Sequence, residues 1–181
     1  MKVILGVTGS VASKLTSRIV EALKIAGHEV QVVATESAMY FFKETDVGVK
    51  VWRDKDEWTG DIYKKDQDIP HISLRGWADI IIMAPLSANT LAKLANGMCD
   101  NLLTSLMRAW DFEKPVILAP AMNTHMWEHP ITAEHLNKLR GWYNKLLVVE
   151  PVSKKLACGD IGKGAMADIR DTINAISLIL A

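Results

Sequence analysis

The fold is decided by residues Asp79–Asn101, DIIIMAPLSANTLAKLANGMCDN, in which a strand, a polar turn and the start of a helix follow one another. The apolar run Ile80–Ala84 is too short for a helix and is typical of a strand buried on both faces. Pro85 has no backbone donor, so we expect the strand to end there. Open α/β sheets hold their ligands at such turns, beyond the carboxyl ends of parallel strands.

The turn Ser87-Ala88-Asn89-Thr90 has two interpretations that this stretch alone leaves open. Backbone N–H groups at the start of the helix would suit a phosphate or a polarised heterocycle. Alternatively, Ser87 or Asn89 is simply the N-cap of the helix.

Buried strands alternate with helical patterns along the whole chain. This alternation predicts a parallel sheet covered by helices on both faces. The expected fold is a single α/β domain over residues 1–181, with a Rossmann-like (flavodoxin-like) three-layer arrangement. Residues 54–68 are polar and are expected to form a mobile loop, and residues 152–167 a glycine-punctuated loop. The expected strands are residues 3–7, 29–34, 49–52, 80–84, 116–119 and 146–149.

The composition excludes several classes of function. Lys plus Arg total 21 and Asp plus Glu total 21, so no net field attracts nucleic acid or an anionic membrane. No apolar run approaches the ~20 residues of a membrane helix. Cys99 and Cys158 form neither a CxxC pair nor a zinc set, which favours free thiols in a reducing compartment and predicts a cytoplasmic protein.

Three further motifs and one histidine could form a site with the first. Gly9-Ser10 lacks the dinucleotide fingerprint and could bind a single phosphate, or Gly9 only makes a turn and Ser10 a cap. Asn123 lies among Met, Pro and Trp and could fix a carboxylate, although a loop packed by these side chains is the alternative. Cys158 lies in a glycine-rich segment that could open and close, where the thiol could serve as an acid or a nucleophile. His71, before the central strand, could be an acid–base group or an ordinary surface histidine.

Together these motifs resemble the homo-oligomeric flavin-containing cysteine decarboxylases over nearly the whole chain. The sequence departs from that family at Gly76, where relatives usually carry a second Arg, and at Ser13, which replaces a small apolar residue. The segments that carry the resemblance are residues 9–12, 71–79, 84–90, 99–104, 120–127 and 156–166.

The resemblance implies a cofactor and a role for individual residues. His71 would be the active-site base, Asn123 would bind the substrate carboxylate, and Cys158 would be the proton donor. Substrate contacts would come from Asn123, Met126, Lys155, Leu156 and Ala157. The cofactor FMN would be held by Gly9, Ser10, Val11, Thr35, Glu36, Ser37, Ser87, Ala88, Asn89, Thr90 and Ala121.

The resemblance also implies a reaction and an assembly. The substrate would be 4'-phosphopantothenoylcysteine, converted to 4'-phosphopantetheine in coenzyme A biosynthesis. Its thiol would be oxidised to a thioaldehyde, CO2 would leave, and the resulting enethiol would be reduced again. The family is trimeric, with flavin sites between subunits.

Three alternatives stay open. A peptidyl-cysteine decarboxylase uses the same chemistry on a peptide, but Lys154 and Lys155 suit a substrate phosphate. A flavin prenyltransferase is disfavoured by Cys158. A regulatory binding protein of a phosphatase is the remaining alternative, and it would need neither His71 nor Cys158, both of which are present.

Overall fold

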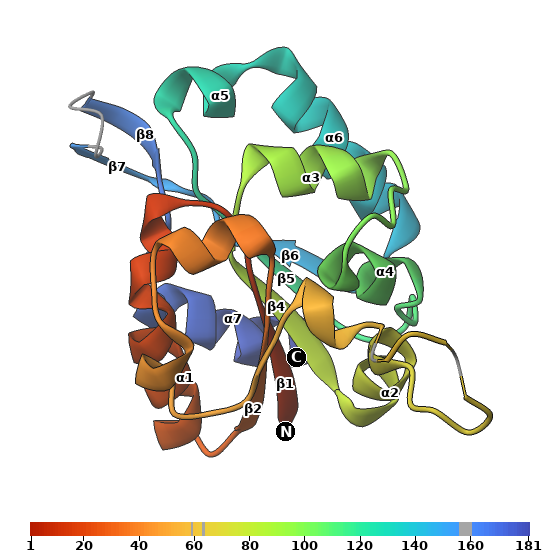
Figure 1. Ribbon diagram of the computed structural model, residues 1–181. Helices are drawn as coiled ribbons and strands as arrows, with labels where there is room; N and C mark the ends of the chain where they lie inside the picture. The colour runs from red at the N-terminus through yellow and green to blue at the C-terminus, as the bar shows by residue number, and fades with distance from the viewer. Residues whose placement is uncertain (59, 63, 156–160) are drawn as a thin grey trace.

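A six-stranded parallel sheet forms the middle layer of the computed structural model, with helices on both sides (Figure 1). The structure describes residues 1–58, 60–62, 64–155 and 161–181. The strand order is β3-β2-β1-β4-β5-β6, so the chain builds outward from β1 in one direction and then returns to build outward from β4 in the other. The strands are β1 Lys2–Val7, β2 Glu29–Ala34, β3 Val51–Trp52, β4 Ile80–Leu86, β5 Val116–Pro120 and β6 Leu146–Val148.

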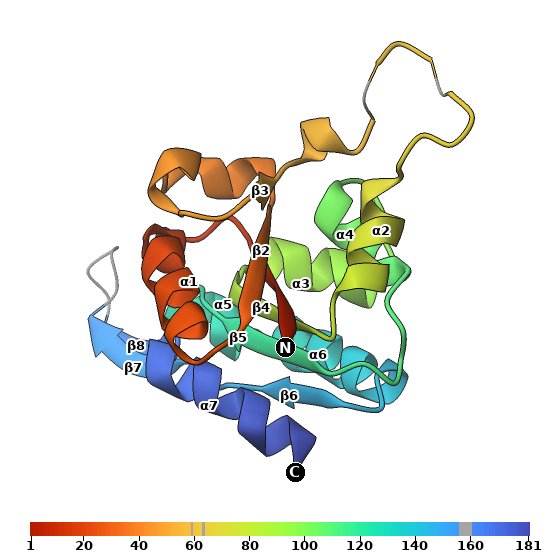
Figure 2. The same cartoon turned by 90° about the horizontal axis from the view of Figure 1, so that it is seen from below.

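Two hydrophobic cores, one on each face of the sheet, hold the layers together. Successive residues of a strand point to opposite faces, so Leu5 packs in one core and Ile4 in the other. Helices α1 and α7 cover the first face, and α2, α3, α4 and α6 cover the second (Figure 2). The predicted parallel sheet covered on both faces is therefore confirmed. The helices are α1 Thr16–Ile25, α2 Pro70–Trp77, α3 Ala88–Ala95, α4 Leu102–Arg108, α5 Thr124–Glu128, α6 Pro130–Trp142 and α7 Ile169–Leu180.

Short 3-10 helices follow three of the strands. The turn after β1 continues into η1, Val11–Leu15, before α1 begins. After β2 come η2, Glu36–Tyr40, and η3, Glu44–Asp46. After β3 comes η4, Asp54–Asp56.

Two predictions from glycine and proline are wrong. Pro85 does not end the central strand, because β4 runs on to Leu86, which pairs with Pro120 of β5. The register shifts between Met83 and Leu86, and such an irregularity is where a strand tolerates a residue without a donor. Residues 152–167 are not simply a loop, because β7, Val152–Lys155, and β8, Ile161–Ala165, form an antiparallel hairpin.

The expected loop at residues 54–68 is ordered at its beginning. It starts with η4, and Glu57, which follows η4, is only 5% exposed. The polar pattern concealed this, because Glu57 is a charged residue and charged residues are seldom buried unless they are paired.

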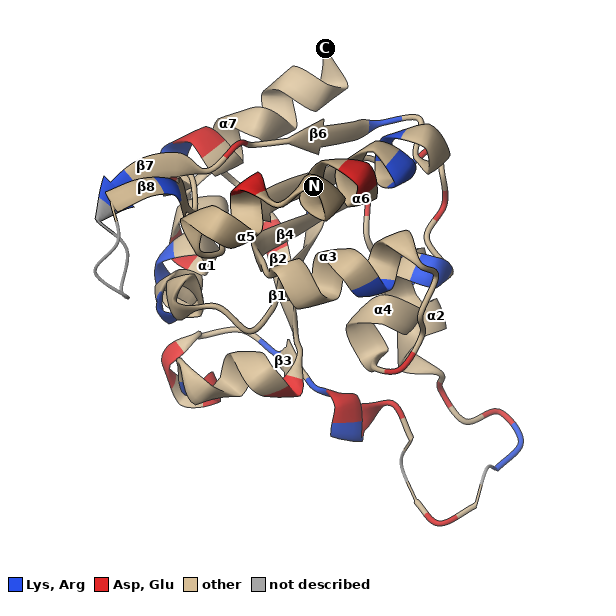
Figure 3. Cartoon of the chain, turned by 90° about the horizontal axis from the view of Figure 1, so that it is seen from above, with Lys and Arg blue, Asp and Glu red and all other residues tan. Residues whose placement is uncertain are grey.

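Charged residues of both signs are spread over the elements of the chain rather than gathered on one of them (Figure 3). Within the described residues, no helix has the length and the apolar character that crossing a membrane requires.

Candidate active site

The turns expected to bind a ligand lie at the carboxyl ends of four neighbouring strands. These strands are β2, β1, β4 and β5, which stand side by side in the sheet. Between β1 and β4 the connections leave in opposite directions, and open α/β sheets bind their ligands beyond the carboxyl edge at such a switch point. The turns after β1 and β4 lie at this switch point.

Thr8 joins the ends of β1 and β4. Its side chain is fully buried, and its Oγ1 donates to the Pro85 carbonyl oxygen at 2.8 Å. The Thr8 Oγ1 also accepts from the Ser87 backbone N–H at 2.7 Å. These two bonds hold the Gly9–Val11 turn beside the Ser87–Thr90 turn, although the two are far apart in the sequence.

The turn after β2 packs against the turn after β1. A Cβ atom on Gly9 would lie 2.6 Å from Ser37 Oγ, so only glycine permits this approach. Ser37 Oγ in turn lies 3.2 Å from Thr35 Oγ1. Ser10 is the N-cap of η1, where its Oγ accepts from the Ala12 N–H at 3.4 Å, and Val11 beside it is 42% exposed.

The Ser87–Thr90 turn begins α3 with a side-chain cap. Ser87 Oγ accepts from the Thr90 N–H at 3.3 Å, which identifies Ser87 rather than Asn89 as the N-cap. Both Ser87 and Thr90 are buried, Ala88 is half-buried, and Asn89 is exposed. Capping therefore occupies the side chain of Ser87 and leaves Asn89 at the surface of the turn.

The carboxylate of Glu36 is engaged by Arg53, which is not among the predicted cofactor residues. Both oxygens accept from Nη2 of Arg53, at 2.6 and 2.7 Å. Hydrogen bonds to Glu36 and Glu44 raise the pKa of the Arg53 guanidinium above its usual range. The remaining predicted cofactor residues carry no charged side chain, and several of them are Ser or Thr. Their hydroxyls and backbone N–H groups suit a phosphate-bearing mononucleotide. The residues present thus fit FMN.

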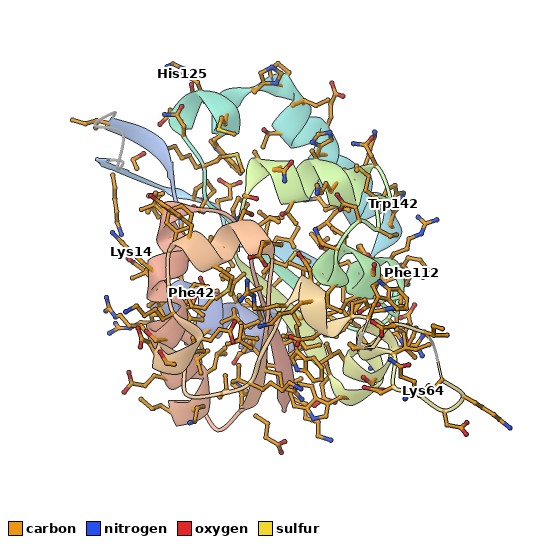
Figure 4. All side chains as sticks on the ribbon, viewed as in Figure 1. Lys14, Phe42, Lys64, Phe112, His125 and Trp142 are labelled. Carbon is orange, nitrogen blue, oxygen red and sulfur yellow. The ribbon has the colours of Figure 1, made fainter. Side chains whose placement is uncertain are left out.

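The Asn123 motif follows β5 at the same edge. The buried Ala121 donates its N–H to the Leu86 carbonyl oxygen at 2.9 Å, which ties the motif to the end of β4. Asn123 is half-buried and caps α5, since its Oδ1 accepts from the His125 N–H at 2.9 Å. His125 itself is exposed and lies on the outer side of α5 (Figure 4). Met126 is 48% exposed.

The β7–β8 hairpin packs on the Asn123 motif. The Met122 N–H donates to the Gly164 carbonyl oxygen at 3.0 Å, and a Cβ atom on Gly164 would lie 2.3 Å from the Met122 carbonyl oxygen. The backbone of Lys155 pairs with Ile161 at the far end of the hairpin. Lys154, considered for a substrate phosphate, contacts Asp168 through its Nζ at 3.0 Å. The predicted Leu156, Ala157 and Cys158 lie outside the described residues.

His71 is held apart from these turns within a single chain. It lies in the first turn of α2, whose contacts are with α4, and Figure 1 shows α2 and α5 on opposite sides of the molecule. Its side chain is 22% exposed, and Nδ1 contacts Oε1 of Glu57. The structure therefore gathers the expected cofactor turns with Asn123, and leaves the expected base elsewhere on the surface.

Two residues of this arrangement were not expected from the sequence. Thr8 lies outside every segment predicted to form the site, and Glu57 lies in the expected loop at residues 54–68. Both act through partners distant in the sequence, so no local spacing could have indicated them.

Known proteins resemble the chain over its full length. A family model described as Flavoprotein matches residues 1–180. Phosphopantothenoylcysteine decarboxylase from Mus musculus is 47% identical over 182 residues, which cover 99% of this chain and 87% of the relative. These matches span the four turns, the Asn123 motif and the hairpin together.

Two solved structures agree with this relationship. A cysteine-to-serine PPC decarboxylase mutant complexed with pantothenoylaminoethenethiol is 40% identical with a TM-score of 0.91, covering 99% of this chain and 97% of the other. The FMN binding protein AtHal3 is 41% identical with a TM-score of 0.87, covering 98% and 95%. The chain therefore belongs to the Flavoprotein family, among the phosphopantothenoylcysteine decarboxylases.

Proposed function

We propose that the chain binds FMN and converts 4'-phosphopantothenoylcysteine to 4'-phosphopantetheine and CO2, a step of coenzyme A biosynthesis. The observation that carries this proposal is the 47% identity to the mouse decarboxylase across 99% of the chain. One domain over residues 1–181 would carry the activity. Two cysteines without a CxxC spacing favour a reducing compartment, so the proposed location is the cytoplasm.

The four turns at the carboxyl edge would hold the cofactor. FMN, when bound, supplies a reversible hydride acceptor, which gives the substrate an electron sink for the loss of CO2. The Gly9–Val11 and Ser87–Thr90 turns lie at the switch point of the sheet, and the bonds of Thr8 fix their spacing. Glu36 would contribute its backbone, because its carboxylate is engaged by Arg53.

Asn123 would orient the substrate carboxylate through its amide nitrogen. Its Oδ1 already accepts from the His125 N–H. A carboxylate only accepts hydrogen bonds, so Nδ2 is the atom of Asn123 that would face it. His71 would take the proton of the substrate thiol, and Met126, Lys155, Leu156 and Ala157 would contact the rest of the substrate.

Cys158 would return a proton to the substrate carbon in the second half of the reaction. A solved relative is described as a cysteine-to-serine mutant complexed with pantothenoylaminoethenethiol. An enethiol is the compound that remains when CO2 has left and the substrate has not been reduced again. This pairing of a lost thiol with a retained enethiol supports the role proposed for Cys158.

The site would be shared between subunits of a homotrimer. Within one chain, His71 on α2 lies apart from Asn123 and α5 (Figure 1). Both residues can act on one substrate if a second copy of the chain brings its α2 to this edge. A closed cyclic trimer would form such a site at each of its equivalent interfaces.

The spectrum of the purified protein and its CO2 release test the function together. We expect a yellow protein that releases FMN on denaturation and forms CO2 from 4'-phosphopantothenoylcysteine. A peptide ending in cysteine serves as the comparison substrate and should be turned over poorly. A protein without FMN, or one that prefers the peptide, would contradict the proposal.

A further inference from the structure

Glu57 is a buried carboxylate with one satisfied oxygen. Its Oε1 contacts Nδ1 of His71, and its side chain is 5% exposed. Its Oε2 is buried and has no hydrogen-bond partner among the residues that the structure describes. Burying a carboxylate oxygen without a partner destabilises the fold, and such groups are exceptions that call for an explanation.

The backbone beneath Glu57 is anchored on several sides. Asp54 Oδ1 accepts from the Leu102 N–H at 3.1 Å, which ties η4 to the start of α4. Asp56 Oδ2 accepts from the Arg53 N–H at 2.7 Å, which fixes the start of η4. The Glu57 N–H donates to the Asp54 carbonyl oxygen at 3.2 Å. These hydrogen bonds therefore fix the backbone that carries the Glu57 carboxylate beside His71.

The contact decides which ring nitrogen of His71 exchanges a proton. An ionised carboxylate can only accept a hydrogen bond, so Nδ1 must carry a proton in both the neutral and the charged imidazole. Nε2 is then the nitrogen that gains and loses a proton. Because His71 is 22% exposed and Glu57 is buried, a substrate reaches this pair from the histidine side.

We propose that Glu57 is a positioning residue that holds His71 in the Nδ1-protonated tautomer for the decarboxylation. The inference rests on the proposed function, in which His71 is the base. The S–H bond of the substrate breaks, the proton passes to Nε2, and the electron pair stays on sulfur. The buried carboxylate then faces the imidazolium, which it stabilises as an opposite charge.

Two variants separate the hydrogen bond from the charge. Glu57→Leu removes both, and we expect kcat to fall about 10- to 100-fold with little change in KM, by analogy with groups that orient metal-ligating histidines. Glu57→Gln keeps an acceptor for Nδ1–H and should lose less. Nitrogen-15 NMR of the FMN-loaded protein should find His71 protonated at Nδ1 in the wild type and in Glu57→Gln. In Glu57→Leu it should find a mixture of tautomers. The His71→Asn variant assigns the signal.

A control variant tests whether the loss of kcat comes from a disturbed backbone around η4 and not from the lost contact with His71. Glu44 accepts a hydrogen bond from Arg53, the residue before η4. Glu44→Gln weakens this bond and leaves the Glu57–His71 contact in place, so its kcat should match the wild type. An unchanged kcat in Glu57→Leu, or a wild-type His71 protonated at Nε2, would overturn the proposal. If Glu57→Leu does not fold, Glu57→Ala takes its place, and an unchanged kcat in that variant overturns the proposal. A protein that releases no CO2 would refute the proposed function, while the tautomer measurement would still decide the role of Glu57.

Discussion

Single polar side chains set the shape of the proposed site. The Thr8 hydroxyl donates one hydrogen bond and accepts another between the ends of β1 and β4. One hydroxyl thus fixes the relative position of two turns proposed to bind the cofactor. Glu57 fixes His71 in a similar way from a separate part of the chain. In a buried environment such bonds are strong and their loss is costly, which makes the geometry reproducible.

Tyr143 offers a test of burial at a single residue. Its hydroxyl donates to the Met107 carbonyl oxygen at 2.8 Å, and burial raises the pKa of Tyr143 to about 12. The folded state therefore keeps a proton that the unfolded chain loses near its ordinary pKa of about 10. The stabilisation of the folded state by protonated Tyr143 is complete below pH 10 and is lost as the pH rises towards 12.

Tyr143→Phe should accordingly lose about 0.5–1.5 kcal/mol at neutral pH, the net value of one hydrogen bond. Chemical denaturation of both proteins between pH 8 and pH 12 measures the difference. We expect the gap between wild type and variant to shrink above pH 10. A gap that stays constant to pH 12 would mean that the tyrosine is not protected by burial.

Residues that act within their own turn could be predicted from the sequence, and residues that act at long range could not. Ser87 caps α3 through Thr90, three residues away, so the spacing was visible. Asp168 occupies the N-cap position of α7, where a short acidic residue is typical, but it makes no side-chain cap hydrogen bond. Its carboxylate, however, contacts Lys154 of β7, which local spacing cannot reveal.

The β7–β8 hairpin shows why glycine misled the prediction at the level of elements. Gly162 and Gly164 lie in the segment predicted to be a glycine-punctuated loop, whereas they are the places where β8 meets the Asn123 motif. A Cβ atom on Gly162 would lie 2.6 Å from Thr124 Oγ1. Glycine in a strand marks close approach as well as flexibility, and the sequence alone does not distinguish the two.

Gly164→Ala tests the contact between the hairpin and the Asn123 motif. The new Cβ would meet the Met122 carbonyl oxygen at 2.3 Å, so the hairpin must move away from the motif. We expect a rise in KM and a fall in kcat, with FMN still bound, because the turns after β1, β2 and β4 are unaffected.

Gly141→Ala is the matched control for this change. Gly141 lies near the end of α6, and no heavy atom lies within 4 Å of its added Cβ. Alanine in a helix should leave activity unchanged and raise stability by about 0.5–1 kcal/mol. Wild-type kinetics in Gly164→Ala would show that the hairpin does not need this packing.

At the scale of the whole molecule, the pattern of strands and helices predicted the class of fold but not the order of the strands. Alternation of buried strands with helices implies a parallel sheet with two covered faces, and both cores are present. The place of β1 beside β4 depends on which strands pair although they are far apart in the sequence. The hydrogen bond between Thr8 and Pro85 depends on that pairing. The separation of His71 from Asn123 follows from the same topology.

That separation makes a prediction about mixed assemblies. If each site takes Asn123 from one subunit and His71 from its neighbour, His71→Asn and Asn123→Asp are each inactive alone and complement each other when mixed. Random mixing in equal amounts should leave about a quarter of the sites with both intact residues, as expected for a cyclic assembly. CO2 release by co-expressed variants, with differently tagged subunits to confirm mixing, measures this recovery.

The control for this experiment is a mixture of His71→Asn with Glu57→Leu. Glu57 and His71 contact each other within one chain, so no exchange of subunits restores an intact pair. This mixture should stay at the average of its two components, while the first mixture should exceed its average. Mixed trimers of His71→Asn and Asn123→Asp that recover nothing would place both residues in the site of a single subunit. Such a result would require α2 to move relative to α5 within the chain, and the shared-site proposal would then fail.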